Sequence, residues 1–352
     1  MRVGVAGLGR IGAMHARNLA RTPGVDEVVL IGRDAGRTES VRARLAAQRD
    51  AEQTTESGAP GSDVWAPVST TVDPLADVLP SLDGILVASA TDTHAELARV
   101  VADSHTPLLI EKPLALGVDE LTELSRDLDA TGTPIMVAFH RRYDPGYQRL
   151  RQHVLDGDVG TLRLVQATEN DHYALPVDYI PQSHGMWLDL LVHDFDIIPW
   201  TVGDPVVEVS MIGSVLDEPV YGDHQDTDTA MVTLRFASGA VGSIGALRRS
   251  DAGQDVRLEV TGSKGAYGAG YGPRTPITST EPGGSAPSNP YDTFGDRFVP
   301  AFEEEIAHFV RMIRGESESL TPPAAGLVAT ALAEAAAESF HTGRPVRPRT
   351  TA

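Results

Sequence analysis

The chain has 352 residues, of which 41% are hydrophobic, and this length favours two globular domains. Its 29 basic and 49 acidic residues give a net charge of −20, which excludes nucleic acids and anionic membranes as expected partners. The absence of cysteine excludes thiol chemistry, and no run approaches the roughly 20 apolar residues of a membrane span, so we expect a cytoplasmic protein.

The first expected element is a short apolar strand that runs into three glycines and then a helical pattern. Gly7, Gly9 and Gly12 have the G-x-G-x-x-G spacing in the strand–turn–helix context of a dinucleotide-binding loop. The first glycine allows the tight turn, the second lets a pyrophosphate approach the backbone, and the third lets the helix pack closely. The phosphates would bind N–H groups at the helix start, beside Arg10 and Ile11. The alternative is a glycine turn that binds nothing.

Strands and helices then alternate as far as residue 139. We expect strands at 27–31, 64–68, 84–88, 107–110 and 135–139, and helices at 35–49, 94–102 and 118–130. The alternation predicts a Rossmann domain over residues 1–139, an α/β unit with a doubly wound parallel sheet. Because loops after parallel strands share one sheet edge, we expect further cofactor-binding residues there. They are Gly32, Arg33, Ser89, Ala90, Thr91, His94, Glu111 and Lys112.

Lys112 also has a position that favours chemistry. It follows an expected strand and precedes Pro113, which stiffens the turn. We therefore expect its ammonium group at the sheet edge where a nicotinamide would lie. The alternative is a surface lysine.

From residue 140 onward, strands follow one another without intervening helices. A strand at 161–168 lies between helices at 145–155 and 186–202, and further strands are expected at 206–215, 229–236, 240–246 and 256–261. Residues 268–296 are expected to form a loop, followed by helices at 298–313 and 324–341. This order predicts an α+β domain over residues 140–352 with a large open, mainly antiparallel sheet. We expect the final helix to pack back on the first domain.

The expected helix at 186–202 is apolar nearly all round, yet it carries titratable residues. Asp189 and His193 are four residues apart and would share one face, with Asp196 continuing the stripe. Burying such groups costs several kcal/mol unless they are paired. They therefore form either a site, a satisfied buried pair or a pair that faces solvent. The histidines lack H-x-H or H-x-x-x-H spacing, so no metal site is expected.

Taken together, these features resemble the glucose–fructose oxidoreductase/inositol dehydrogenase/rhizopine catabolism (Gfo/Idh/MocA) oxidoreductases. The resemblance is carried by the glycine fingerprint, by Glu111-Lys112-Pro113 and by the stretch from Gly185 to His193. The segments 141–147 and 192–196 look particularly like inositol 2-dehydrogenases. The resemblance extends over nearly the whole chain.

The resemblance implies a hydride transfer between a nicotinamide cofactor, NAD(P), and a secondary alcohol or ketone of a cyclic polyol or sugar. It implies His193 as general base, with Asp189 orienting the substrate and raising the basicity of the imidazole. Lys112 would hydrogen-bond the reacting oxygen. Arg141 and Asp196 correspond to positions that line the polyol pocket. The resemblance and the open sheet together imply a homodimer or homotetramer.

Two segments depart from inositol dehydrogenases. Residues 250–255 lack the tyrosines that those enzymes place near the substrate, and the loop at 170–185 is longer. That loop carries His172, a candidate substrate residue. We therefore expect a related polyol, sugar or keto-sugar in place of myo-inositol. The alternatives are an NADPH-dependent reductase of keto-sugars or keto-sugar nucleotides and a non-enzymatic NAD(P)-binding sensor.

The end of the second strand indicates which cofactor binds. NAD enzymes usually place an acid there for the ribose 2′-OH, whereas this chain has Gly32 followed by Arg33. Arg33 and Arg10 together would suit a 2′-phosphate, which favours NADP. Asp34 is the counter-argument, because a shift of one residue would restore the acid.

Overall fold

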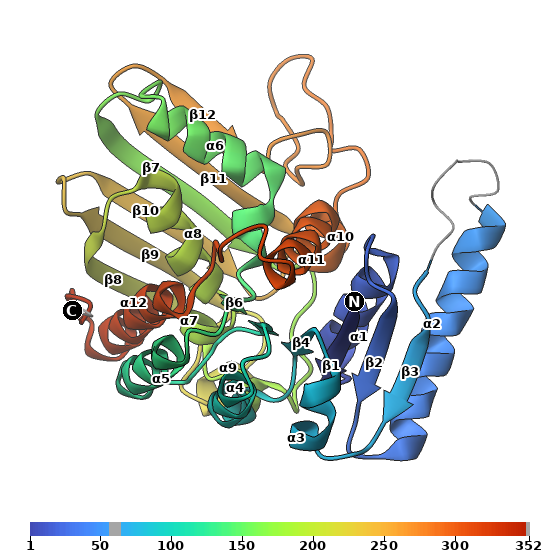
Figure 1. The fold of residues 1–352 in the computed structure, drawn as a ribbon. Helices are drawn as coiled ribbons and strands as arrows, with labels where there is room; N and C mark the ends of the chain where they lie inside the picture. Colours follow the sequence, from blue (N-terminus) through green and yellow to red (C-terminus); the bar gives the residue numbers. More distant parts are fainter. Residues whose placement is uncertain (56–64, 350–352) are drawn as a thin grey trace. The chain divides into compact units, whose positions relative to one another are not determined.

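A computed structural model describes residues 1–55 and 65–349 and divides the chain into two compact units (Figure 1). The first unit comprises Met1–His140 and Phe302–Gly326, and the second comprises Arg141–Ala301 and Leu327–Ala352. The first break falls one residue from the expected boundary, but the return of residues 302–326 to the first unit was not expected. The packing of the final helix on the first domain stays a prediction.

The first unit contains a six-stranded parallel sheet in the order β3-β2-β1-β4-β5-β6, which confirms the expected Rossmann arrangement. Its strands are β1 (Arg2–Ala6), β2 (Glu27–Ile31), β3 (Val68–Thr71), β4 (Gly84–Val87), β5 (Leu108–Ile110) and β6 (Ile135–Val137). Its helices are α1 (Arg10–Arg21), α2 (Ala35–Thr55), α3 (Leu75–Val78), α4 (His94–Asp103), α5 (Val118–Thr131) and most of α11 (Val299–Ile313).

The inner strands of this sheet are buried because helices cover both of its faces. All four residues of β4 are buried, as are four of the five in β1 and in β2. Such strands carry continuous apolar runs, in contrast to the alternation of a half-exposed sheet. The weakly marked strand expected at 64–68 begins instead at Val68, and Val64 lies outside the described residues.

In the turn between β1 and α1, two of the three glycines have no room for a Cβ atom, whereas the third does. Gly7 has a φ of 93°, and a Cβ there would lie 2.3 Å from the Ala88 backbone. A Cβ at Gly12 would lie 1.8 Å from the Gly7 carbonyl oxygen. At Gly9, in contrast, a Cβ would meet no atom within 4 Å. The loop and helix are therefore packed backbone to backbone, with open space beside Gly9.

The second unit contains a sheet in the order β12-β11-β7-β10-β9-β8, in which only β7 and β10 pair in parallel. Its strands are β7 (Leu162–Asn170), β8 (Val206–Ser214), β9 (Thr229–Phe236), β10 (Val241–Leu247), β11 (Asp255–Gly262) and β12 (Ala266–Ala269). Its helices are α6 (Pro145–Leu155), α7 (Met186–Asp189), α8 (Val192–Val202), α9 (Val220–Asp223), α10 (Phe294–Arg297) and most of α12 (Pro323–Thr342). The expected open, mainly antiparallel sheet is confirmed.

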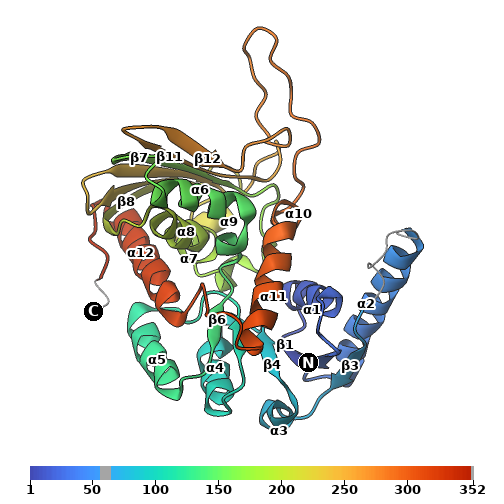
Figure 2. The same ribbon diagram turned by 45° about the horizontal axis from the view of Figure 1, so that its top comes forward.

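Helices cover one face of this second sheet. Figure 2 shows α6 and α8 beneath it, and no described helix of this unit lies over the opposite face. Strand β9 shows the resulting alternation, since Ala230, Val232, Leu234 and Phe236 are buried while Met231, Thr233 and Arg235 are exposed. This pattern of period two is what a half-buried strand requires.

The single helix expected over 186–202 is wrong, because the structure has two helices there. Helix α7 ends at Asp189 and helix α8 begins at Val192. Between them the Leu191 N–H donates to the carbonyl of Met186, five residues earlier, at 2.9 Å. This bond interrupts the regular i−4 ladder. Asp189 and His193 therefore belong to different helices, although they lie four residues apart.

None of the described helices is long and apolar enough to cross a membrane. The cytoplasmic location stays a prediction.

The glycine turn gives a prediction about stability. Gly12→Ser is expected to lower the free energy of unfolding by about 1–3 kcal/mol, because the new Cβ would overlap the Gly7 carbonyl. Gly9→Ser is the matched control and is expected to stay within about 0.5 kcal/mol, since it faces open space and serine is a good N-cap. Chemical denaturation of both variants measures the difference, and equal losses would contradict this account.

Candidate active site

Three loops of the first unit meet at one edge of the parallel sheet. His15, from α1, contacts Glu111 through Nε2 and Oε1 at 2.9 Å. The buried ring of His94 contacts the Pro113 carbonyl through Nδ1 at 2.8 Å and the Ser89 carbonyl through Nε2 at 3.2 Å. These contacts connect α1, the loop after β4 and the turn after β5. The expected convergence of these loops is confirmed within this unit.

Glu111 fixes the turn that carries Lys112. Burial would raise the pKa of Glu111, but the hydrogen bond from His15 and the charge of Lys112 hold that pKa below its usual value. The other carboxylate oxygen, Oε2, accepts the backbone N–H of Lys112 at 3.2 Å. An ionised Glu111 therefore holds the backbone of the residue that is the candidate catalytic lysine.

Glu305 is a further buried acid that sequence analysis did not find. Its side chain on α11 is fully buried, and neither carboxyl oxygen has a hydrogen-bond partner among the described residues. Burial, followed by the charge of Glu111, raises the pKa of Glu305 well above its usual value. The available signal was its position on the apolar stripe formed by Phe302, Ile306 and Phe309.

The start of α1 fits the pyrophosphate of a dinucleotide. No side chain caps this 12-residue helix at Gly9, and its first turn carries no acidic residue. The first N–H groups of such a helix lack intrahelical partners and attract anions. The space beside Gly9 leaves room for the phosphates. The residues present therefore fit the cofactor that the sequence predicts.

The end of β2 has no room for an acidic side chain at Gly32. A Cβ there would lie 1.8 Å from the hydroxyl oxygen of Thr38, which itself donates to the Asp34 carbonyl. The Asp34 carboxylate accepts the backbone N–H of Arg37 at 2.7 Å, so it caps the start of α2. The side chain of Arg33 is exposed at the same place.

In the second unit, the stretch 186–198 is almost completely buried. Its partly exposed residues are Trp187, Asp189 and His193, and the other ten are buried. The Asp189 side chain is 17% exposed. A carboxylate and an imidazole therefore reach the surface of an otherwise buried segment, where a ligand could meet them.

Arg248, which sequence analysis missed, holds Asp189. Its fully buried guanidinium donates to Asp189 Oδ2 at 2.5 Å and to Asp226 Oδ2 at 3.2 Å. Burial opposes the charge, but the two carboxylates raise the pKa of Arg248. The signal in the sequence was alternation: Arg248 lies two and four residues beyond the inward-facing Ala246 and Ile244.

Arg141 and Asp196, predicted to contact substrate, both lie in buried ion pairs. Arg141 pairs with Glu169 at 2.6 Å and with Asp194 at 3.4 Å. Burial raises the pKa of both Glu169 and Asp194, although Arg141 opposes this. Asp196 accepts two hydrogen bonds from Arg142, at 3.0 and 2.6 Å. Arg141 thus pairs with two carboxylates, whereas Arg142 pairs with one.

His172, the third candidate substrate residue, is tied to the long loop before α10. Its Nδ1 contacts the Asp292 carbonyl at 3.0 Å, and the Tyr173 hydroxyl donates to Asp292 Oδ1 at 2.6 Å. Nearby, the buried Gln254 donates to Asp171 Oδ1 at 2.9 Å. Polar groups therefore gather at the ends of β7 and β11.

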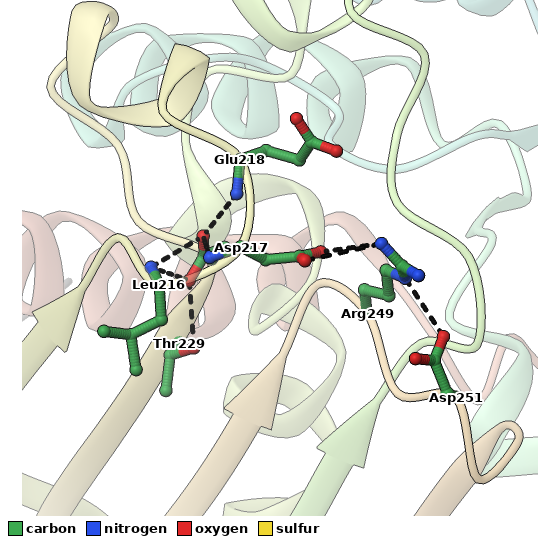
Figure 3. A network of polar contacts seen from close by, with 7 residues as sticks. Leu216, Asp217, Glu218, Thr229, Arg249 and Asp251 are labelled. Atoms are coloured by element: carbon green, nitrogen blue, oxygen red, sulfur yellow. Dashed lines mark hydrogen bonds and ion pairs between the residues drawn. The ribbon is translucent and has the colours of Figure 1, made fainter.

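A turn beside Arg248 is organised by a single carboxylate. Asp228 accepts the N–H groups of residues 216–218, at 3.0, 2.8 and 3.1 Å, and the hydroxyl of Thr229 at 2.9 Å (Figure 3). Burial alone would raise the pKa of Asp228, but these donors lower it below its usual value. The Asp228 carbonyl also accepts the Arg248 N–H at 2.8 Å, so the turn and Arg248 are connected.

Within the part of the chain that the structure describes, no group of three or more His, Asp or Glu side chains could hold a metal ion.

The parallel sheet and its glycine loop define a dinucleotide-binding oxidoreductase, and residues 1–139 match the oxidoreductase family with an NAD-binding Rossmann fold. Residues 147–268 match the GFO/IDH/MocA C-terminal domain. The chain belongs to the GFO/IDH/MocA family of oxidoreductases.

Similar proteins match this chain over almost its full length. A myo-inositol 2-dehydrogenase of Thermotoga maritima is 32% identical over 353 residues, which cover 99% of this chain and 98% of the relative. An inositol 2-dehydrogenase of Rhizobium meliloti is also 32% identical, with 98% of each chain covered. Among solved structures, a probable dehydrogenase from Thermotoga maritima has a TM-score of 0.85 at 30% identity, with 99% of each chain covered.

The turn around Asp228 gives a prediction with a pH dependence. A carboxyl whose pKa is lowered by folding stabilises the fold above the unfolded pKa, and the contribution disappears as the pH falls through the folded value. Asp228→Asn is therefore expected to cost about 1–3 kcal/mol at pH 7, and less on acidification below about pH 4. Denaturation at several pH values measures this.

The control for that experiment is Asp251→Asn, because Asp251 is 81% exposed and pairs with the half-exposed Arg249 (Figure 3). Its effect is expected to stay within about 1 kcal/mol. A difference between Asp228→Asn and the unmodified chain that does not change with pH would contradict the assignment.

Proposed function

We propose that this oxidoreductase interconverts a secondary alcohol and a ketone of a cyclic polyol or sugar, with NAD(P) as cofactor. The observation that carries the proposal is the partial exposure of Asp189 and His193 within an otherwise buried stretch. Two relatives that match almost the whole chain are named inositol dehydrogenases, which supports a ring polyol as substrate class. The substitution of residues 250–255, where inositol dehydrogenases have tyrosines, supports a related polyol, sugar or keto-sugar.

Each candidate residue has one role in this proposal. His193 takes the proton from the reacting hydroxyl, since an imidazole changes charge near neutral pH. Lys112 donates a hydrogen bond to the same oxygen and stabilises its developing negative charge. Asp189 accepts a hydrogen bond from a neighbouring hydroxyl and so orients the ring. When bound, the nicotinamide supplies the two-electron redox chemistry.

The catalytic assignment predicts which variants lose turnover. Lys112→Met and His193→Ala are each expected to lower kcat/KM by about 100-fold or more, because each removes a group that acts on the reacting oxygen. The affinity for the cofactor alone is expected to change little in His193→Ala. Absorbance of the reduced nicotinamide is followed with a panel of polyols and keto-sugars in both directions.

Lys264→Met is the matched control, because Lys264 is an exposed lysine whose ammonium group donates to the Gly157 carbonyl. It is expected to keep full turnover. Undiminished turnover in both Lys112→Met and His193→Ala would refute the assignment. An unmodified enzyme that binds cofactor but turns over nothing in either direction would favour the sensor, and activity only on keto-sugars with NADPH would favour the reductase.

We further propose NADP as the preferred cofactor. A carboxylate at position 32 would collide with Thr38, and the Asp34 carboxylate is engaged as the cap of α2. The usual acceptor for a ribose 2′-OH is therefore absent at Gly32, and one oxygen of Asp34, Oδ1, is already used to cap α2. Arg33 and Arg10 have exposed side chains that would provide charged donors for a 2′-phosphate.

Cofactor preference is tested with the double variant Arg10→Ala/Arg33→Ala. It is expected to weaken NADP binding by roughly 10- to 100-fold, since charged hydrogen bonds contribute about 1.5–3 kcal/mol each, and to change NAD binding little. Dissociation constants for both cofactors are measured by titration. Arg44→Ala, in the exposed part of α2, is the control. Equal losses for the two cofactors would refute the preference.

We also propose that the chain forms a homodimer or homotetramer through the face of the second sheet that no helix of its unit covers. Ile212 and Met231 lie opposite each other on β8 and β9, and they are 71% and 45% exposed. Such adjacent exposed apolar side chains favour contact with another surface. A monomer in light scattering would exclude the assembly.

A further inference from the structure

Arg248 is an arginine that the proposed function does not use, although it lies at the centre of a buried hydrogen-bond network. Its side chain has no exposed surface, and a buried guanidinium is tolerated only when carboxylates pair with it. Asp189 supplies one carboxylate, at 2.5 Å, and Asp226 supplies the other, at 3.2 Å. One cation therefore joins two acids that lie 37 residues apart.

This network holds helix α7 at both ends. Asp226 uses Oδ1 to accept the backbone N–H of Met186, the first residue of α7, at 2.8 Å. Arg248 binds Asp189, the last residue of that helix. A helix of four residues has almost no stability of its own, because nucleation is unfavourable. The helical ladder is also interrupted after Asp189, so α8 does not supply the missing support through continuous i−4 bonds.

The geometry leaves Asp189 able to serve a ligand. Arg248 binds one carboxylate oxygen, Oδ2, from the buried side, while part of the Asp189 side chain remains exposed. An ionised carboxylate has about four acceptor positions, so one guanidinium contact does not exhaust it. The planar fork of arginine spans the two carboxylates at a fixed angle, which a lysine ammonium on a flexible stem does not reproduce.

We infer that Arg248 is a positioning residue for catalysis: it fixes the Asp189 carboxylate so that the exposed side of this group receives a substrate hydroxyl. The inference rests on the proposed function of Asp189 as the group that orients the ring. Arg248 acts entirely through Asp189 and does not touch the substrate.

A double-mutant cycle tests whether Arg248 acts through Asp189. Four proteins are compared: the unmodified chain, Arg248→Lys, Asp189→Asn and the double variant. The substrate is the polyol, sugar or keto-sugar that the unmodified chain converts fastest. Arg248→Lys is expected to lower kcat/KM by roughly 10- to 100-fold, because it removes the fork while keeping the charge. Asp189→Asn is expected to lower it at least as much.

The decisive result is the kcat/KM of the double variant, compared with that of Asp189→Asn. If Arg248 acts only through Asp189, the double variant has the same kcat/KM as Asp189→Asn alone, because the interaction is already lost. Additive losses in the double variant would overturn the inference, since they would show an independent effect of Arg248. Unchanged kcat/KM in Arg248→Lys would overturn it as well.

Two further variants separate positioning from folding. Arg249→Lys is the matched control, because this neighbouring arginine is 42% exposed and pairs with Asp217 and Asp251 (Figure 3). It is expected to keep full activity. Asp226→Asn approaches the network from its other end and is expected to lower kcat/KM about 10-fold, with the loss again absent in the Asp189→Asn background. If Arg248→Lys does not fold, Asp226→Asn takes its place in the double-mutant cycle with Asp189→Asn.

The same data distinguish the inference from the proposed function. Full activity of Asp189→Asn would refute the role of Asp189 and the inference with it, and so would an unmodified chain that is silent on every substrate. A loss in Asp189→Asn combined with an additive loss in the double variant would refute the role of Arg248 alone.

Discussion

The first unit depends on the close approach of helix α1 to the turn that precedes it. Neither Gly7 nor Gly12 has room for a Cβ, so the helix starts directly against the end of β1. Once α1 is fixed, its His15 reaches Glu111, and the turn after β5 is tied to the same edge of the sheet. Backbone packing at two glycines therefore determines where the loops gather, and the uncapped start of α1 faces the space that remains.

The second unit is organised by buried ion pairs. Three arginines of this unit, Arg141, Arg142 and Arg248, are buried or nearly buried. Each pairs with one or two carboxylates that lie on other elements of the unit. Removing one partner of such a pair leaves an uncompensated buried charge, at a typical cost of 3–5 kcal/mol. A well-packed apolar interior would often be as stable or more so. Charged groups held in fixed orientations are suited to a ligand rich in hydroxyls, since each hydroxyl both donates and accepts a hydrogen bond.

Much of the fold follows from local patterns, and the exceptions have identifiable causes. The alternation of strands with helices after the glycine loop predicted the parallel sheet, and the series of strands without intervening helices predicted the second sheet. The break after Asp189 was not predictable from periodicity, because apolar residues continue on both sides and a single bond from Leu191 to Met186 sets it. Arg248 was missed because a charged residue at a strand end is usually exposed. Asp196 was predicted as a substrate residue from the family resemblance, and neither that resemblance nor helical spacing indicated its partner Arg142. The roles of Lys112, Asp189 and His193 stay predictions.

Residues 302–326 return to the first unit, so this unit is built from two segments that are not continuous in the sequence. The Val137 N–H, on the edge strand β6, donates to the carbonyl of Thr321 at 2.8 Å. On the neighbouring part of the sheet, a Cβ at Gly84 would lie 2.5 Å from the Ile313 side chain, so α11 packs there without a gap. A gene fragment that ends near residue 140 therefore encodes an incomplete cofactor unit with an uncovered edge. An exchange of the whole first unit between two proteins of this architecture would have to transfer both segments together, because residues 302–326 belong to the same unit as residues 1–140.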